Sequence, residues 1–334
     1  MLESLGLLLV GFIVGCYGTL VGIGGGPIIV PVVALAYQYS TSTVVAISFF
    51  VIFFNTLSGS IAYLKQKRVD VITGVKFGLV TIPGSLISTF ALDHIHLEHF
   101  KVIHGLFLFV LAIYIFFKPP ESETTQRPGF STGRGIAAPK LRSHPTLGLR
   151  LDEIVFSPLR ALRMSSVALL PSKKRRTTHR SPGLSESDGS IYVPAPQKKY
   201  SYRIITDAMG NIYRYRFNER LGMGISALIG VFSTFLGIGG GLIQVPVLVY
   251  LLSFPVHIGT ATSHYITMIN CGFTLIPLLV HGDIVYRPAI LLALGVVAGA
   301  QMGARLSKRI SGRNLLKLLI PVFVLMGIKL VFFR

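Results

Sequence analysis

The sequence predicts an all-α polytopic membrane protein built from two inverted repeats, each with a glycine-broken helical hairpin followed by three transmembrane helices. Three observations lead to this prediction. Hydrophobic residues make up 51% of the 334 residues and charged residues only 13%, with a mean hydropathy of +0.65, which lies outside the range of soluble globular proteins. The hydrophobic residues gather in long runs, and one glycine-rich motif occurs twice, 215 residues apart.

Eight apolar runs account for this composition. Most of them reach about 18–20 residues, the length that a helix needs to cross a bilayer. They cover residues 5–37, 43–64, 71–92, 100–117, 221–254, 257–280, 288–304 and 315–333. Each run is therefore expected to lie in the membrane.

The second half of the chain repeats the first. At an offset of 215 the first glycine motif falls on the second, and several spaced positions agree without a gap. Because so many positions agree, we predict two homologous membrane repeats, residues 1–118 and 219–334, joined by an insertion at residues 119–218. The matching positions are Gly22 to Gly26 with Gly237 to Gly241, Pro31 with Pro246, Ala46 with Ala261, Ser48 with Ser263, Asn55 with Asn270 and Gly84 with Gly299.

The first segment of each repeat is expected to break at its glycines. Residues 21–27 hold four glycines and one proline, and each glycine inside a helix costs about 0.5–1 kcal/mol relative to alanine. The arms on either side, of roughly 16 and 11 residues, are too short for two perpendicular spans. We therefore predict helical hairpins that dip into the bilayer and turn at residues 22–26 and 237–241, which we name the first and second glycine tips.

The basic loops change sides between the two repeats. In the first repeat the basic loop is 65–68, whereas the equivalent loop at 281–287 is nearly neutral and the basic one, 305–313, comes one connection later. Positive charge marks the cytoplasmic side of a membrane protein. Each repeat is therefore expected to cross the plasma or inner membrane an odd number of times, with the central insertion in the cytoplasm and both termini outside.

The insertion carries most of the net charge of +19. Residues 118–220 hold nineteen Lys and Arg against eight Asp and Glu, a bias that indicates cytoplasmic placement and not nucleic-acid binding. Docking of the basic run 173–176 on anionic lipids is the functional alternative. Residues 119–197 are expected to be largely disordered, whereas residues 200–217 alternate apolar and polar side chains around 207–211 and predict a β-hairpin.

Each glycine tip leads into the N-terminus of the second helical arm. A helix N-terminus carries partial positive charge and unpaired N–H groups, which makes it an anion site. Two such tips near the bilayer midplane are typical of the substrate site of a secondary transporter, although close helix packing is an alternative use of glycine clusters. The candidate substrate-binding glycines are Gly22, Gly24, Gly25, Gly26, Gly237, Gly239, Gly240 and Gly241.

Polar residues on the second segment of each repeat are expected to line the same site, with helix–helix hydrogen bonding as the alternative. His264 has Phe49 as its partner in the first repeat, and it carries a coupling proton, donates to the anion or is a structural histidine. No Asp or Glu lies deep in any segment, which favours an anion over a cation as the substrate. The candidate residues are Ser48, Asn55, Ser263, His264 and Asn270.

Sequence motifs of other functions are missing. The only cysteines, Cys16 and Cys271, lie in apolar segments and form no CxxC, zinc spacing or disulfide framework. Nothing in the sequence resembles a P-loop, a nucleophile elbow or a hydrolase triad. We therefore predict no enzyme activity, no cofactor and no metal site.

The duplicated motif also resembles that of a known family. GIGGGPIIVP and GIGGGLIQVP, each followed by an A-x-S element and later by a helix with small residues (Gly84 with Ser85, Gly299 with Ala300), are similar to the TauE/SafE sulfite exporter family. The resemblance covers both repeats. It implies a secondary transporter or facilitator that moves sulfite, thiosulfate or an organosulfonate in either direction, whereas the insertion is longer than the family's short central connection.

Two other functions remain open at this point. A transmembrane thiol redox protein would use Cys16 and Cys271, and a membrane receptor would act through the basic insertion. The sequence predicts a small anion and the lipid bilayer as partners, and makes no prediction of the oligomeric state. Alternating access by rocking of the repeats is the expected mechanism of the transporter.

Overall fold

The computed structural model describes residues 2–91 without 38, residues 125–126, residues 200–312 without 283, and single residues between 106 and 113 and between 314 and 328. Within these parts, five helices are long and apolar enough to cross a membrane. This confirms the predicted mostly helical, multi-pass membrane protein. The fourth segments, 100–117 and 315–333, lie largely outside the described residues. The five helices are α1 (Leu2–Val21), α3 (Thr41–Lys65), α4 (Val71–Ala91), α10 (Val256–Val280) and α11 (Tyr286–Leu306).

Both first segments break at the predicted glycines. α1 is followed by α2 (Gly26–Ala36), and α8 (Glu219–Phe235) is followed by α9 (Gly241–Pro246), which continues as the π-helical turn η3 (Val247–Leu251). Three glycines in each tip have positive φ, between 68° and 92°, a region that only glycine adopts at little cost. These glycines are Gly22, Gly24 and Gly25 in the first tip, and Gly237, Gly239 and Gly240 in the second.

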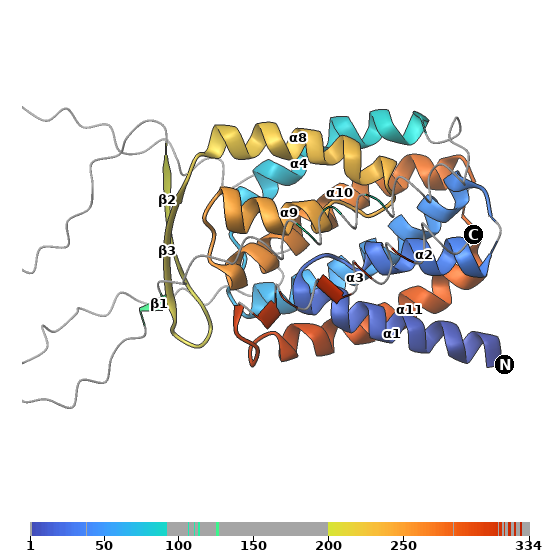
Figure 1. Cartoon of the computed structure of the whole chain (residues 1–334), viewed down its shortest axis with the longest axis horizontal. Coiled ribbons are helices and arrows are strands. Elements are labelled where there is room, and N and C mark those ends of the chain that lie inside the picture. The colour runs from blue at the N-terminus through green and yellow to red at the C-terminus, as the bar shows by residue number, and fades with distance from the viewer. Residues whose placement is uncertain are drawn as a thin grey trace, which may run out of the picture. The chain divides into compact units, whose positions relative to one another are not determined.

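Helices of the two repeats are interleaved. α1 packs along α11, and its equivalent α8 packs along α4 (Figure 1). Glycines allow the close approach, since an added Cβ on Gly15 would lie only 2.5 Å from the Cα of Val296. α3 and α10 pack on each other, α3 also packs on α11, and α10 on α4. Each of the two groups, α1 with α3 and α11, and α8 with α4 and α10, therefore contains helices from both repeats.

Equivalent helices of the two repeats run in opposite directions. α3 ends beside the β-sheet, where the carbonyl of Gln66 accepts a hydrogen bond from the backbone N–H of Ala208 at 2.9 Å. Its equivalent α10 begins beside the same sheet, where the ring of Phe254 lies 4.4 Å from that of Tyr215. This opposition is what an inverted repeat requires. The number of crossings in each repeat stays a prediction, because the fourth segments lie largely outside the described residues.

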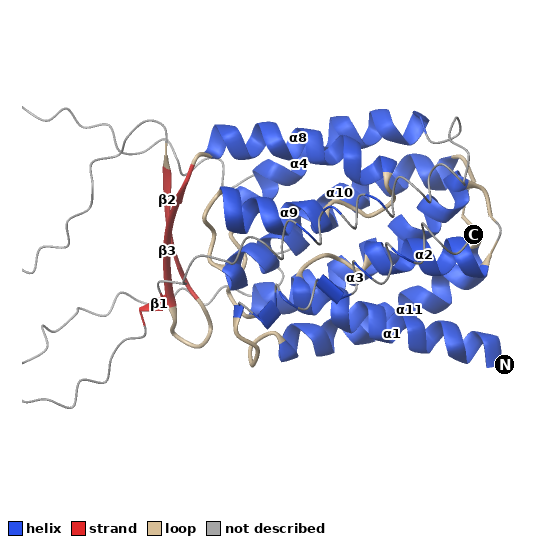
Figure 2. Cartoon of the chain, in the orientation of Figure 1, coloured by secondary structure: helices blue, strands red, loops and turns tan. Residues whose placement is uncertain are grey.

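The described part of the insertion forms a small sheet. β2 (Ser201–Thr206) and β3 (Ile212–Phe217) pair as an antiparallel hairpin, with Ser201 opposite Phe217 and Thr206 opposite Ile212 (Figure 2). This confirms the hairpin predicted at 200–217. A two-residue strand, β1 (Thr125–Gln126), pairs with the other edge of β3. It is too short to show an alternation of apolar and polar residues in the sequence. The disorder expected for 119–197 otherwise falls outside the described residues.

The hairpin is attached to helix ends of the first repeat by buried charges. Arg68, which follows α3, pairs with Asp207 in the hairpin turn, with Nε and Oδ2 3.7 Å apart. Asp70, which precedes α4, pairs with Arg203 at 3.5 Å and accepts a hydrogen bond from the Tyr215 hydroxyl at 2.8 Å. Removing one partner of such a buried pair leaves an uncompensated charge, so these contacts hold the hairpin in place.

The turn aspartate is held in its ionised form. Burial by itself would raise the pKa of Asp207, but hydrogen bonds from Asn211 and from the backbone of Met209, together with the charge of Arg68, lower it below its ordinary value of 3.8. A carboxylate with a lowered pKa stabilises the folded state above its unfolded pKa and loses that contribution as the pH falls below it. The attachment of the hairpin is therefore complete at neutral pH.

Candidate anion site at the glycine tips

The two glycine tips touch each other through their backbones. An added Cβ on Gly26 would lie 2.5 Å from the carbonyl oxygen of Ile238, and one on Gly241 would lie 2.8 Å from that of Ile23. The two contacts are equivalent under the 215-residue offset. All eight candidate glycines are buried. The structure therefore brings together, in a reciprocal pair, the two segments that the sequence singles out.

Each tip carries backbone N–H groups without a hydrogen-bond partner among the described residues. The N–H groups of Ile28 and Ile29 bond to the carbonyl of Gly25, but those of Gly25 and Gly26 have no acceptor. In the second tip the same holds for Gly240 and Gly241. Unpaired buried N–H groups are rare in proteins, and here they lie at helix N-termini, where the dipole favours negative charge.

Each of the two candidate asparagines donates a hydrogen bond to a backbone carbonyl of one glycine tip. Nδ2 of Asn55 donates to the carbonyl of Gly24 at 2.8 Å, and Nδ2 of Asn270 donates to that of Gly239 at 3.5 Å. The described peptide bonds are trans, so the N–H on the same peptide points away from the carbonyl. Each asparagine therefore turns the N–H of the next glycine, Gly25 or Gly240, away from itself.

Two hydroxyl groups fix the asparagines, and sequence reasoning missed both. Thr19 on α1 donates to Oδ1 of Asn55 at 3.0 Å, and the hydroxyl of Ser85 on α4 lies between two acceptors, Oδ1 of Asn270 and the carbonyl of Thr81. With its Oδ1 occupied as an acceptor, the amide of Asn55 can only donate from Nδ2 toward its tip. The repeat held a signal for Thr19, because the offset of 215 places Thr234 at the same position.

The two candidate serines have different surroundings. Ser263 donates to the carbonyl of Gly241 in the second tip at 3.3 Å. Ser48 is equally buried but donates at 2.8 Å to the carbonyl of Val44, one turn earlier in its own helix. Only Ser263 of this pair contacts a tip through a hydrogen bond.

His264 lies beside the first tip. Its Nε2 is 3.3 Å from Oγ1 of Thr19, and its ring meets that of Tyr63 edge-on with centroids 5.8 Å apart. Gly59 on α3 makes room for the ring, because an added Cβ there would come within 2.8 Å of Cδ2. The structure therefore connects His264, Thr19 and Asn55 into one buried chain of polar groups.

The two cysteines are placed against different elements. Cys271 is buried, with Sγ 3.8 Å from the carbonyl of Gly239 in the second tip. Cys16 lies on α1 against α11, where an added Cβ on Gly299 would meet its nitrogen at 2.7 Å. Both are free thiols.

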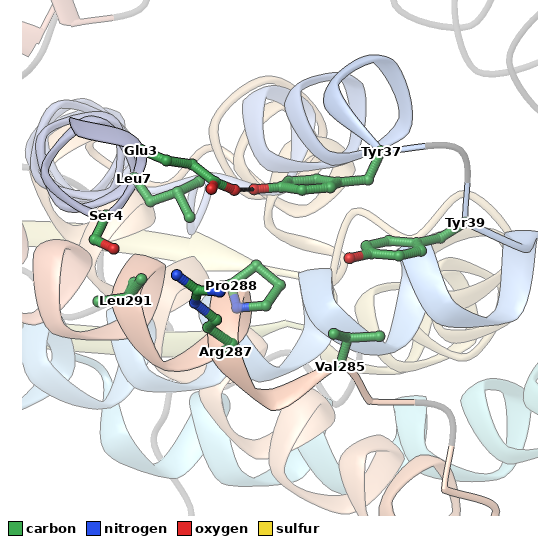
Figure 3. Close-up of a pocket in the computed structure, with 9 residues that line it drawn as sticks. All are labelled: Glu3, Ser4, Leu7, Tyr37, Tyr39, Val285, Arg287, Pro288 and Leu291. Atoms are coloured by element: carbon green, nitrogen blue, oxygen red, sulfur yellow. Dashed lines mark hydrogen bonds between the residues drawn. The ribbon is translucent and has the colours of Figure 1, made fainter. Parts of the chain in front are cut away.

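An open pocket lies at the end of the helices away from the sheet. Its volume is about 140 Å³, and Arg287 lies beside it across from Glu3 and two tyrosines (Figure 3). The rings of Tyr37 and Tyr39 stack at 5.1 Å, and the hydroxyl of Tyr37 donates to Glu3 at 2.9 Å. The lining residues are Glu3, Ser4, Leu7, Tyr37, Tyr39, Val285, Arg287, Pro288 and Leu291.

At the sheet end, the positions equivalent to this pocket are covered by the hairpin. Tyr215 of β3 places its ring 4.4 Å from Phe254 and its hydroxyl 2.8 Å from Asp70, and it shares a buried hydrophobic cluster with Leu252. The described residues therefore form a pocket at the end away from the sheet, and at the sheet end the hairpin covers the equivalent positions. Under the 215-residue offset, Leu252 corresponds to Tyr37, Phe254 to Tyr39 and Asp70 to Val285.

Comparison with known proteins gives a consistent result. The model of a family described as sulfite exporter TauE/SafE matches residues 7–330. A probable membrane transporter protein of Bacillus subtilis (strain 168), YunE, is 22% identical over 333 residues, which cover 98% of this chain and 96% of that protein. A probable membrane transporter protein of Methanocaldococcus jannaschii, MJ0441, is 31% identical over 115 residues, covering 33% of this chain and 43% of that protein. No solved structure matches the chain.

Proposed function

The chain belongs to the sulfite exporter TauE/SafE family and is a multi-pass membrane transporter, and we propose that it carries a small sulfur-containing anion, such as sulfite, thiosulfate or an organosulfonate, by alternating access. The anion binds at the two glycine tips. Backbone N–H groups and helix dipoles hold it, and the asparagines behind each tip keep these donors aimed at the ligand.

The observation that carries this proposal is the set of unpaired N–H groups at the tips. Gly25, Gly26, Gly240 and Gly241 are buried, and their N–H groups have no acceptor among the described residues. A buried donor without a partner costs about 1–3 kcal/mol. An oxyanion offers several acceptor oxygens at once, so its binding would remove this cost at both tips.

The charges around the tips favour an anion. Asp70 lies just before α4 and is bound to Thr73, Tyr215 and Arg203, so it is not directed at the tips. Within the described helices, the side chains that hydrogen-bond to the tips carry amides, a hydroxyl and a thiol, and none of them is a carboxylate. The carboxylates that commonly bind a cation are therefore missing from these contacts.

The difference between the two ends supports alternating access. The pocket around Arg287 is open, whereas the equivalent position at the other end is filled by Tyr215 and its neighbours in the hairpin. One state of an alternating-access cycle has one open and one closed end. Because α1 with α3 and α11 forms one group and α8 with α4 and α10 the other, the moving parts are groups that mix helices of both repeats.

The test is uptake of radiolabelled sulfite, thiosulfate and sulfate by the purified protein in liposomes, beside the double variant Gly25→Val/Gly240→Val. Both glycines have positive φ, 86° and 92°, which costs a residue with Cβ about 1–2 kcal/mol. We expect uptake of one sulfur oxyanion, lost in the double variant. The matched control is Gly210→Val, with φ of 84° in the hairpin turn and nothing within 4 Å of an added Cβ. Equal uptake by the tip variant and the control would contradict the site, and no uptake of any anion by the unaltered protein would contradict the substrate class.

A further inference from the structure

We propose that His264 takes up one proton together with the anion, which makes this protein a proton-coupled anion transporter. The inference rests on the proposed function, because the anion at the first glycine tip supplies the negative charge next to the protonated ring. The observation behind it is the chain of hydrogen bonds that runs from Gly24 through Asn55 and Thr19 to His264. This chain determines which nitrogen of the His264 ring is free to accept a proton.

His264 is the fully buried member of the three histidines that the structure describes, with no exposed surface. It lies on α10 one turn after Thr260, and an added Cβ on Gly22 of the first tip would lie 2.6 Å from the carbonyl oxygen of Thr260. The backbone of Gly22 also neighbours the imidazole itself. The ring is therefore held between α3 and the first tip.

The hydrogen-bond chain assigns the tautomer of the imidazole. Nδ2 of Asn55 donates to the carbonyl of Gly24, so its Oδ1 is an acceptor, and the hydroxyl of Thr19 donates to that Oδ1. Thr19 has only one O–H, so its oxygen can only accept from His264. Nε2 of His264, 3.3 Å away, therefore carries the hydrogen, and Nδ1 keeps the lone pair.

Nδ1 is the unused acceptor of the chain. It is buried and has no hydrogen-bond partner among the described residues. A buried acceptor left unpaired costs about 1–3 kcal/mol, and a proton on Nδ1 would turn it into a donor.

A buried imidazolium needs a negative charge. None of the ion pairs of the described residues includes His264. The titratable neighbour on α3 is Tyr63, whose ring meets the imidazole edge-on. An anion at the first tip would be the missing counter-charge, and the proton would reduce the cost of burying the anion.

Proton and anion binding are therefore linked. If the anion raises the proton affinity by some factor, the proton raises the anion affinity by the same factor. The step breaks no covalent bond in the anion: a proton from water joins the Nδ1 lone pair on one side and returns to water on the other. Phe49 occupies the equivalent position in the first repeat, so only one of the two equivalent positions can take up a proton in this way.

The asymmetry of the repeats supplies the test variant. His264→Phe introduces the residue that the chain itself uses at the equivalent position, and His281→Phe changes an exposed histidine after α10 as a matched control. Thiosulfate and sulfite are the probes in liposomes that contain a pH-sensitive dye. Thiosulfate, which does not take up protons near neutral pH, excludes protons carried by the anion itself.

We expect a proton gradient to drive at least tenfold accumulation of the anion, with proton entry recorded by the dye, in the unaltered protein and in His281→Phe. His264→Phe should lose both the gradient-driven accumulation and the proton signal. Anion uptake without proton movement in the unaltered protein would overturn the inference and leave the proposed function standing. Absence of all anion uptake would instead overturn the proposed function.

A second measurement does not depend on transport. The ¹⁵N NMR signals of His264, assigned by their loss in His264→Phe, should show hydrogen on Nε2 and a bare Nδ1 without anion. Adding thiosulfate or sulfite should shift the titration of this ring to higher pH. A hydrogen on Nδ1 without anion, or a titration that neither anion moves, would overturn the inference.

Discussion

At the scale of single residues, the asparagines explain how a tip made of glycine can keep a defined donor direction. Glycine alone leaves the peptide planes free to turn. Asn55 and Asn270 remove that freedom by binding the carbonyls of Gly24 and Gly239, and Thr19 and Ser85 hold the amides in turn. The proposed anion site is therefore preorganised by side chains that need not touch the anion.

This role predicts the effect of shortening the asparagines. Asn55→Ala and Asn270→Ala should each lower the rate of anion uptake about tenfold, because the tip carbonyl is no longer held and the loss of one hydrogen bond to it costs about 1–3 kcal/mol. The measurement is initial uptake in liposomes at equal amounts of folded protein.

The control for this prediction is Ser58→Ala. Ser58 lies on α3 like Asn55, but its hydroxyl donates to the carbonyl of Val297 on α11 at 2.9 Å, away from the tips. It should change stability and leave uptake near the level of the unaltered protein. Equal losses in Asn55→Ala and Ser58→Ala would show that Asn55 acts only through folding.

At the scale of elements, the hairpin β2–β3 is attached to the ends of the helices. Two ion pairs, the buried one of Arg68 with Asp207 and the half-buried one of Asp70 with Arg203, join it to the first repeat. Tyr215 and Phe217 pack on Phe254 before α10. It therefore contacts both repeats at the sheet end. The proposed alternating-access cycle requires this end to open.

We predict that opening of this end exposes Leu252, which is 2% exposed under the hairpin. In a Cys16→Ser/Cys271→Ser background, Leu252→Cys should react slowly with a water-soluble maleimide. Asp70→Asn combined with Asp207→Asn should speed this reaction about tenfold, because both ion pairs of the hairpin lose their charge. Transported anion should also speed it, since the closed end opens during the cycle.

The control uses the symmetry of the repeats. Tyr37→Cys lies at the equivalent position in the open pocket, so it should react quickly whether or not the hairpin is weakened. If Leu252→Cys stays unreactive with weakened ion pairs and with anion, the hairpin is a fixed cover and this end does not open.

At the scale of the whole molecule, the repeats cannot be separated as folding units. α1 packs along α11 and α8 along α4, so each first helix is covered by the other repeat. Glycines such as Gly15 at these contacts leave the backbones in direct contact. The insertion is different, since every helix and strand that the structure describes lies outside residues 130–195.

This arrangement predicts the result of dividing the chain. Replacing residues 130–195 by a flexible Gly/Ser linker should leave folding and anion uptake within about twofold of the full chain, because the helices and strands that the structure describes all lie outside this range. Residues 1–126 or 196–334 expressed alone should be degraded, and their co-expression should restore uptake. Loss of uptake in the linker variant, with folded protein present, would favour the receptor function of the insertion.

The sequence by itself determined the class of the molecule and the place of the candidate site. Run lengths predict membrane helices, the cost of glycine predicts the breaks at residues 22–26 and 237–241, and the repeat pairs Asn55 with Asn270. These signals are local or periodic, so they can be read without knowing which helices touch. The hairpin at 200–217 was also predictable, because alternation of apolar and polar residues is a property of the strand itself.

Only the tertiary structure decided which parts meet. Several features depend on side chains and backbones that packing brings together. They are the interleaving of the repeats, the contact between Gly26 and Ile238, the hydrogen bond of Thr19 to Asn55, the hydrogen bond of Ser48 to its own helix instead of a tip, and the attachment of the hairpin. The bare Nδ1 of His264 is of the same kind, because it follows from partners on α1 and α3 that lie more than 200 residues away in the sequence. Hydrogen-bond direction is set by every member of such a chain at once, so no single segment contains it.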